Sequence, residues 1–449
     1  MTNQRDSDAS AGDEVVEHLR ALLRLDTRNP PGNENVAADY LRDALARDGI
    51  DSTIVGPSPD RASLVACLRG DGSAPPLLLM SHTDVVAVEP DRWTQDPFGG
   101  AIVDGFIYGR GALDMKNMVA MELATMLQLK RRGVRLRRDV IFLAAADEEV
   151  GGRQGAGWVV DHHPDLIRAE YALNEGGGNA REINGRLYYH VQTAEKGIQR
   201  FRLRARGAPG HGSIPRDDNA VLKLADMLAR LRGRHLPAHL TATSRAYIEG
   251  LAAAQSEPMR GQIRAILDPA RCAEAISSLE IESSVKRYIH AVLRNTVSPT
   301  ILHAGSQINV IPSIADAQLD GRILPGQTRA SFTRELRDLF GDDAEIEFLT
   351  PELSFGPLEA DPSGPLWDTI EQVLRERSPG CAVVPKMLAG ATDAKHVARL
   401  GTTVYGFAPE LLTGPDESAR IHGHDERIGV ESLKWGAATL YAVVERFCT

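Results

Sequence analysis

The feature that most constrains the fold is a series of short, continuous apolar runs, each of strand length and each followed by polar residues. The runs span residues 63–68, 77–80, 140–146 and 171–173, and a helix is expected from 115 to about 130. Continuous apolar runs that alternate with helices are typical of a mostly parallel sheet with both faces covered. We therefore predict an α/β domain.

From about residue 187 the pattern changes to alternating polar and apolar residues, as in 188–192 and 199–205. Such alternation is typical of antiparallel strands with one buried face. The α/β pattern later returns and ends in a helix. We therefore predict an α/β domain made of 1–187 and 351–449, with an α+β domain at 188–350 inserted into it.

Composition excludes several classes of protein. The 449 residues are 43% hydrophobic and 25% charged, which is ordinary for a globular chain of two or three domains. The net charge of −10 argues against a nucleic-acid partner. No run approaches the roughly 20 apolar residues of a membrane span. The amino terminus has no apolar signal, and the four cysteines lack CxxC spacing, so we expect a cytoplasmic protein without disulfides.

The polar residues after the apolar runs, together with Asp114 just before the expected helix and His422 in a polar cluster late in the chain, supply two imidazoles and a surplus of carboxylates. This mix suits two zinc ions that share a bridging carboxylate, with one glutamate left over as a base. In a parallel sheet such residues meet at the carboxyl ends of the strands. The set is His82, Asp114, Glu148, Glu149, Glu175 and His422.

Each residue alone also has a plainer interpretation. Asp114 could be a helix N-cap, and His422 could lie on an exposed loop. Glu148 and Glu149 could begin a solvated loop, although two adjacent carboxylates at a buried strand end repel each other and a cation would relieve that repulsion. In the pair His82-x-Asp84, the two side chains point to the same side of an extended segment, so the carboxylate can hold one ring N–H.

The order of these motifs resembles the di-zinc metallopeptidase family that includes aminoacylase-1, acetylornithine deacetylase, succinyl-diaminopimelate desuccinylase and carboxypeptidase G2. Among its members, the longer ones similar to carboxypeptidase S are nearest. The resemblance extends from about residue 15 to 447. The matching segments include LLLMSHTDVV, DGFIYGRGALDMK, FLAAADEEVGG, NEGGG, GAPGHGS, INVIP, GATDAKH and HGHDER.

The resemblance implies two Zn²⁺ per chain, for which Co²⁺ or Mn²⁺ could substitute. His82 and Glu175 would hold one ion, Glu149 and His422 would hold the other, and Asp114 would bridge them. It also implies a cis peptide bond after Asp114.

Two further roles in this domain follow from the resemblance. Glu148 would be the general base, and Asp84 would orient His82. His422 is preferred as a ligand because the family pattern is H-x-x-[Asp/Asn]-Glu, but His424 stays open as an alternative.

In the inserted domain, the resemblance implies a lid that also forms a dimer. His211, otherwise a turn residue, would stabilise the oxyanion, often from the partner subunit. Arg322 and Asn309 would grip the substrate's carboxylate or carbonyl, and Gly390, from the 351–449 part of the other domain, would line the same pocket. An extra insertion at about 235–296 could modify or block the dimer or roof the cleft, so it stays open whether His211 acts in cis or in trans.

Together these features predict a zinc-dependent hydrolase of an amide or peptide bond next to an amino acid with a free carboxylate. It would be an N-acyl-amino-acid deacylase, or a carboxypeptidase or dipeptidase, working as a homodimer on a small molecule. The alternative is a catalytically silent binding protein on the same fold, which the loss of Glu148 or of a metal ligand would have signalled. The acyl group and the side chain are left open.

Overall fold

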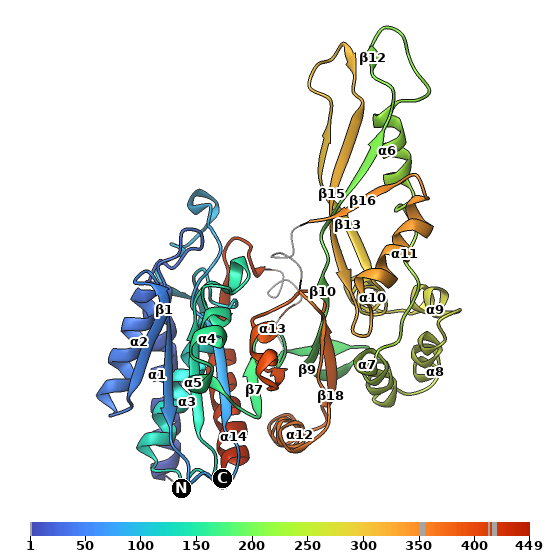
Figure 1. Ribbon diagram of the computed structural model, residues 1–449. Helices are drawn as coiled ribbons and strands as arrows, with labels where there is room; N and C mark the ends of the chain where they lie inside the picture. The colour runs from blue at the N-terminus through green and yellow to red at the C-terminus, as the bar shows by residue number, and fades with distance from the viewer. Residues whose placement is uncertain (1, 350–354, 412–413, 415–419) are drawn as a thin grey trace. The chain divides into compact units, whose positions relative to one another are not determined.

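A computed structural model describes residues 2–349, 355–411, 414 and 420–449. The chain forms two compact units (Figure 1). Unit 1 comprises Met1–Thr193, Ala360–Lys386 and Thr392–Thr449, and unit 2 comprises Ala194–Glu359 and Met387–Ala391. The first boundary therefore follows Thr193, where 187/188 was predicted, and the boundary predicted at 350/351 lies outside the described residues.

The sheet of unit 1 has a parallel centre. Its order is β1-β2-β6-β3-β7-β19-β9, and β6, β3, β7 and β19 run parallel, whereas β2 and β9 flank them antiparallel. The mixed α/β class with a parallel sheet is thus confirmed. The strands are β1 (Ser52–Ser58), β2 (Arg61–Leu68), β3 (Leu77–His82), β6 (Val140–Ala145), β7 (Tyr171–Asn174), β19 (Thr403–Gly406) and β9 (Arg186–Glu195), with β8 (Ala180–Ile183) and β18 (Ala382–Leu388) also paired to β9.

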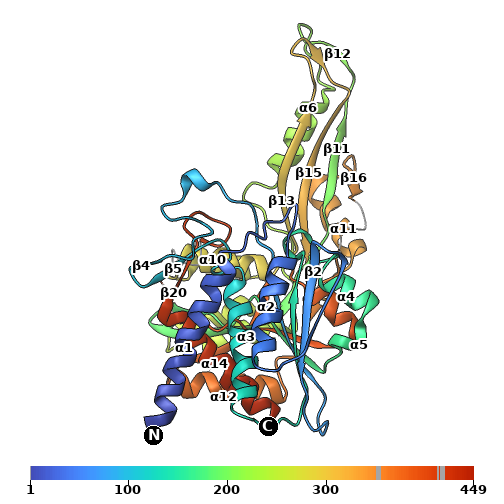
Figure 2. The same ribbon diagram turned by 90° about the vertical axis from the view of Figure 1, so that its left-hand side faces the viewer.

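Helices cover both faces of this sheet, which explains the continuous apolar runs. Successive strand residues point to opposite faces. Leu77 and Leu79 pack on one side with α1 (Thr2–Leu23), α2 (Asn35–Arg47), α3 (Lys116–Arg131), α12 (Pro365–Arg377) and α14 (Val430–Cys448). Leu78 and Met80 pack on the other with α4 (Ala156–His162), α5 (Pro164–Ile167) and α13 (Ala394–Val397). Figure 2 shows the first layer.

A three-stranded sheet also belongs to unit 1. It comprises β4 (Ile102–Val103), β5 (Phe106–Tyr108) and β20 (Arg427–Gly429), in the order β20-β5-β4. It joins the segment before α3 to a segment near the carboxyl terminus.

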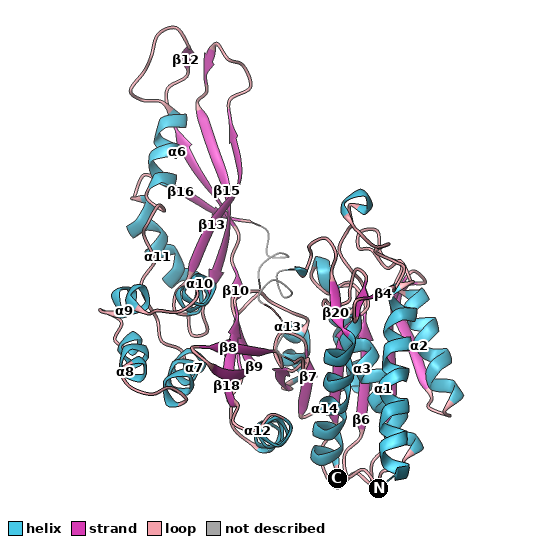
Figure 3. Cartoon of the chain, turned by 180° about the vertical axis from the view of Figure 1, so that it is seen from behind, coloured by secondary structure: helices cyan, strands magenta, loops and turns pink. Residues whose placement is uncertain are grey.

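Unit 2 contains a sheet with one covered face. Strands β16 (Glu345–Phe348), β11 (Phe201–Arg206), β15 (Ile314–Ile323) and β13 (Thr296–Ala304) pair antiparallel, and β10 (Gly197–Ile198) pairs with the end of β15. Burial alternates along β11, as the sequence predicted, and along β15, whereas the alternation predicted for 188–192 is wrong, because β9 is buried from Tyr188 to Glu195. The buried side chains pack with α6 (Ala220–Ala229) and α11 (Arg329–Phe340) (Figure 3). A separate two-stranded ribbon pairs β12 (Gly210–His211) with β14 (Val310–Ile311).

The 235–296 insertion is mainly helical and belongs to unit 2. Its helices are α7 (Ala242–Ala253), α8 (Met259–Arg264), α9 (Cys272–Ser278) and α10 (Ser283–Val292). The buried Lys196 fixes the carboxyl-terminal end of the insertion, because its ammonium donates to the carbonyls of Ala291 and Arg294 and to the Thr296 hydroxyl. Unit 2 also contains the short strand β17 (Leu358–Glu359). The Glu359 carboxylate accepts a hydrogen bond from the Thr243 N–H at the start of α7.

Two further observations bear on the expectations. Helix α1 already begins at Thr2, although the apolar periodicity alone places its start near Asp13. Within the part of the chain that is described, no helix is both long and apolar enough to cross a membrane.

Candidate metal centre

The candidate ligands lie on five loops of unit 1. His82 ends β3, Glu148 and Glu149 follow β6, and Glu175 follows β7. Because these three strands are parallel neighbours, their carboxyl ends meet at one edge. Asp114 precedes α3 across a cis peptide bond to Met115, as expected.

The structure brings these side chains into two groups of donors. His82, Asp114 and Glu175 form one group and Asp114, Glu149 and His422 the other, with the donor atoms of each group within 4.8 Å of one another. The Nε2 of His82 lies 3.1 Å from Asp114 Oδ1, and the Nε2 of His422 lies 3.1 Å from both Asp114 Oδ2 and Glu149 Oε2. Asp114 therefore presents one oxygen to each imidazole, as a bridging ligand would.

The donor set fits two divalent cations. One carboxylate oxygen of Glu149 is buried and has no hydrogen-bond partner. Buried polar atoms are rarely left unpaired, so such an oxygen is an open ligand position. Each group offers one imidazole and two carboxylates, which suits zinc and the neighbouring transition metals. His424 is in neither group.

The two imidazoles hold protons where a metal would bind. Burial alone would lower the pKa of His82, but hydrogen bonds to Asp114 and Asp84 raise that pKa well above its usual range. Hydrogen bonds to Asp114 and Glu149 raise the pKa of His422 to about 10. A metal ion therefore has to displace these protons, and binding should release them.

Two glutamates at the site titrate far above their usual range. Burial, reinforced by the Asp114 charge, raises the pKa of Glu175 to about 8. Burial and the Glu175 charge raise the pKa of Glu148 well above normal. Glu148 belongs to neither donor group, and its Oε1 lies 3.9 Å from the ammonium of Lys395. It is therefore the carboxylate left free to exchange protons.

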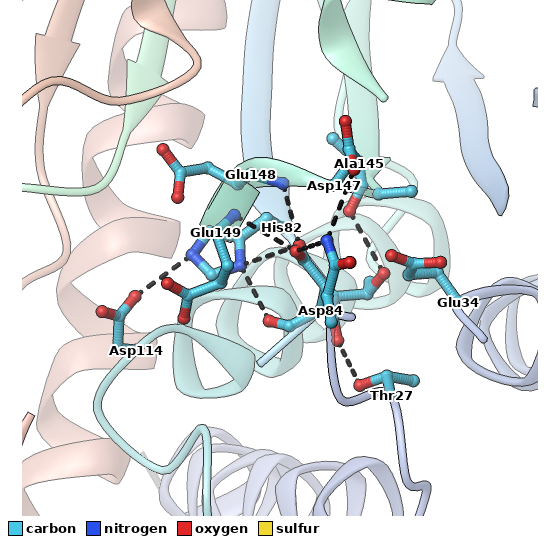
Figure 4. A network of polar contacts seen from close by, with 12 residues as sticks. Thr27, Glu34, His82, Asp84, Asp114, Ala145, Asp147, Glu148 and Glu149 are labelled. Carbon is cyan, nitrogen blue, oxygen red and sulfur yellow. Dashed lines mark hydrogen bonds and ion pairs between the residues drawn. The ribbon is translucent and has the colours of Figure 1, made fainter. Parts of the chain in front are cut away.

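Asp84 organises the turn that follows β6, as Figure 4 shows. Its carboxylate accepts the backbone N–H groups of Glu148 at 3.0 Å and of Glu149 at 3.1 Å. Its carbonyl oxygen lies 3.0 Å from His82 Nδ1, and its carboxylate lies 3.4 Å from the same nitrogen. The His82 ring thus lies closer to the Asp84 carbonyl than to the carboxylate that was expected to orient it, and Asp84 also fixes the backbone of the two glutamates, which was not predicted.

A buried polar network behind Asp84 was missed at the sequence level. Asn29 donates to the carboxylates of Asp84 and Asp147, and the Arg61 guanidinium pairs with Asp147 and with Glu34. Asn29 looked like part of a helix-stopping segment. The one available signal was Arg61, a charged residue that begins an otherwise apolar strand.

The candidate residues of the inserted domain lie in unit 2, at two separate places. His211 and Asn309 come together on the β12–β14 ribbon, where the Gly212 N–H donates to the Asn309 carbonyl at 2.8 Å. Arg322 lies near the far end of β15 and is paired with Asp320 at 2.6 Å. Gly390 falls in the 387–391 segment.

Comparison with known proteins identifies the family. The model of Peptidase family M20/M25/M40 matches residues 78–446, and the chain belongs to this family. It is accordingly a metal-dependent hydrolase of amide or peptide bonds. The alternative of a silent binding protein finds no support.

The relatives cover most of the chain. The N-fatty-acyl-amino acid synthase/hydrolase PM20D1 of Xenopus tropicalis is 30% identical over 80% of this chain and 70% of its own length. Aminoacylase-1 of Homo sapiens is 28% identical over 91% of this chain and 89% of its own length. The M20 family metallo-carboxypeptidase Sso-CP2 from Sulfolobus solfataricus shares the fold, with a TM-score of 0.68 and 18% identity. The match covers 97% of this chain and 99% of that structure.

Proposed function

We propose that this enzyme uses two zinc ions to hydrolyse N-acyl amino acids at the amide bond next to a free carboxylate. The observation that carries the proposal is the pair of donor groups that share Asp114, with Glu148 beside them and in neither. The names of two relatives, a fatty-acyl-amino acid synthase/hydrolase and an aminoacylase, favour the acyl amino acid as substrate. A carboxypeptidase or dipeptidase substrate is the second candidate, since it carries the same amide and carboxylate.

His82 and Glu175 would hold one ion, and Glu149 and His422 would hold the other, with Asp114 between them. Bound zinc or its substitutes Co²⁺ and Mn²⁺ would polarise the amide carbonyl and acidify water. Glu148 would take the proton from the attacking water and deliver it to the leaving nitrogen.

Arg322 would recognise the substrate's carboxylate. A guanidinium pairs with a carboxylate through two parallel hydrogen bonds, and Arg322 already makes such a pair with Asp320, at 2.6 and 3.1 Å. The substrate carboxylate would have to share or replace Asp320. Gly390 would line the same substrate site, whereas Asn309, which lies beside His211 on the ribbon, would reach a substrate together with His211.

The separation of His211 from Arg322 favours a dimer. At a rise of ~3.4 Å per residue, β15 is about 27 Å long between Ile314 and Arg322. His211 lies on the ribbon that precedes the Ile314 end. In an N-acyl amino acid only a few covalent bonds separate the carboxylate from the reacting carbonyl. One copy of unit 2 therefore cannot present both residues to one substrate, and His211 would act in trans.

The surface of unit 2 offers an interface for such a homodimer. Strand β13 is an edge strand, and its Leu302 is 61% exposed. On α6, Leu222 is exposed as well. An apolar edge of this kind pairs readily with a second copy. The hydrogen bonds of Lys196 hold the insertion at the Arg322 end of the sheet. The rest of β13, beyond Val297, is exposed. The insertion would therefore permit the dimer.

The predicted cytoplasmic location also remains a proposal. Cys67, Cys272, Cys381 and Cys448 are free thiols, which suits a reducing compartment.

The experiment is a hydrolysis panel on the zinc-loaded enzyme. N-acetyl and longer N-acyl amino acids, dipeptides and the matching carboxamides are compared for wild type and Arg322→Ala. We expect N-acyl amino acids to be cleaved best, carboxamides poorly, and Arg322→Ala to raise KM for the acids alone.

The matched control is Arg202→Ala, because Arg202 is another strand arginine of the same sheet, paired with Glu347. It should leave both KM and kcat unchanged. Equal wild-type rates on acids and carboxamides would remove Arg322 and the carboxylate from the proposal.

A further inference from the structure

His422 is the ligand with the least support from regular structure. Its side chain is 49% exposed, its φ is +60°, and it lies on a loop before β20. His82, by contrast, is buried at the end of a strand with paired neighbours on both sides. Something other than secondary structure has to fix the His422 backbone if its ring is to bind metal.

Arg110 supplies that support. It is 2% exposed, and its Nη2 donates to the carbonyls of His422 at 3.3 Å and of Gly423 at 3.0 Å. The guanidinium also lies 5.3 Å from the centroid of the Trp93 ring. The arginine therefore fastens the backbone of the His422 loop from inside the protein.

Glu426 connects the same arginine to the bridging ligand. One oxygen of Glu426 accepts Nη1 of Arg110 at 2.5 Å, and the other accepts the backbone N–H groups of Leu113 at 2.8 Å and Asp114 at 3.1 Å. Glu426 is fully buried. Arg110 and Glu426 thus join the loop that carries Asp114 to the loop that carries His422.

We propose that Arg110, supported by Glu426, is a positioning residue mainly for the ion held by Asp114, Glu149 and His422. Arg110 fastens the His422 loop directly and reaches Asp114, which would bridge both ions, only through Glu426, whereas His82 is held by β3 and by Asp84. Groups that orient metal ligands typically contribute about 10–100-fold to metal affinity. The inference rests on the proposed dinuclear site.

The test uses Arg110→Lys in the full-length enzyme. Lysine can still pair with Glu426, but its single ammonium does not reproduce the planar fork that also reaches the two carbonyls. Metal-free protein is titrated with Zn²⁺ against a competing chelator, and the affinities of the first and second equivalents are measured. We expect one of the two equivalents to bind as in wild type and the other to weaken about 10–100-fold. Arg131→Lys, which alters an arginine paired with Glu14 and Asp48, is the matched control and should change neither.

Double mutants show which of the two metal sites loses affinity in Arg110→Lys. Arg110→Lys should lower the affinity for the remaining metal in a His82→Ala background and should change nothing in a His422→Ala background. Glu426→Gln keeps an acceptor for the N–H groups of Leu113 and Asp114 but loses the ion pair with Arg110. It should have the same effect as Arg110→Lys in each of these two backgrounds.

Other outcomes would overturn the inference. Equal weakening of both equivalents, weakening of neither, or failure of both variants to fold would mean that the pair serves the scaffold rather than one metal. Wild type that binds fewer than two ions would instead refute the dinuclear site on which the inference rests.

Discussion

Glu148 and Glu149 are adjacent in the chain, but the proposed function gives them different tasks, and a pair of isosteric substitutions separates these tasks. Glu149 Oε2 lies 3.1 Å from His422 Nε2, and its other oxygen is an unpaired buried acceptor. Glu148 is in neither donor group, and its closest charged partner is the Lys395 ammonium at 3.9 Å. Replacing Glu148 by glutamine should therefore remove a proton acceptor, whereas replacing Glu149 should remove a metal ligand.

The expected size of each effect follows from these contacts. General-base catalysis contributes about 10²–10⁴ in rate, so Glu148→Gln should raise the barrier by about 3–5 kcal/mol while the metal content stays near that of wild type. In Glu149→Gln one metal should be lost on dialysis, because a neutral amide is a far weaker ligand than a carboxylate. Metal content is measured by elemental analysis beside steady-state kinetics, and thermal unfolding checks the fold.

The exposed Glu182 on β8 provides the control, because Glu182→Gln makes the same chemical change away from both groups and should alter nothing. The assignment fails if Glu148→Gln loses metal while Glu149→Gln keeps both ions. It also fails if Glu148→Gln hydrolyses substrate at the wild-type rate.

Three further predictions concern the metal, a buried acid and the inserted domain. Chelation should abolish hydrolysis and Zn²⁺, Co²⁺ or Mn²⁺ should restore it; full activity of metal-free enzyme would refute the site. Burial raises the pKa of Glu122 well above normal, so the folded state holds a proton that the unfolded chain loses above its own pKa, and stability falls as pH rises between the two values. Thermal melts should accordingly show the stability of Glu122→Gln rising relative to that of wild type as the pH is raised above about 5, and a difference that stays constant with pH would contradict this. His211→Ala should keep both metals and lose about 10²–10³ in turnover, and mixing it with Glu148→Gln should restore part of the activity only if His211 acts in trans.

The part of the site that sequence reasoning could reach is the part that strand order determines. His82, Glu148 and Glu175 each follow an apolar run, and in a parallel sheet the ends of such runs meet at one edge. That argument needs only local patterns and the direction of the strands. The positions of Asp114 and His422 came instead from the resemblance to a family, since neither follows an apolar run.

Contacts between distant loops could not be predicted, because no local pattern carries them. Arg110 and Glu426 are 316 residues apart and meet through one buried ion pair. Asn29 and Asp84 meet through a buried hydrogen bond, in which the Asn29 amide donates to the Asp84 carboxylate. Similarly, the distance between His211 and Arg322 depends on the length and register of β15, and periodicity alone does not give it.

The charge balance of the site joins folding to metal binding. Glu175 keeps a pKa of about 8 and His422 one of about 10 because buried carboxylates crowd the ends of the strands. In metal-free protein, protons offset part of this negative charge, and each divalent ion replaces them with a larger positive charge. Any ligand that binds only the folded state stabilises it, by about 4 kcal/mol at a thousandfold excess over Kd. A site that is costly to bury without metal is therefore also the site at which metal contributes most to the stability of unit 1.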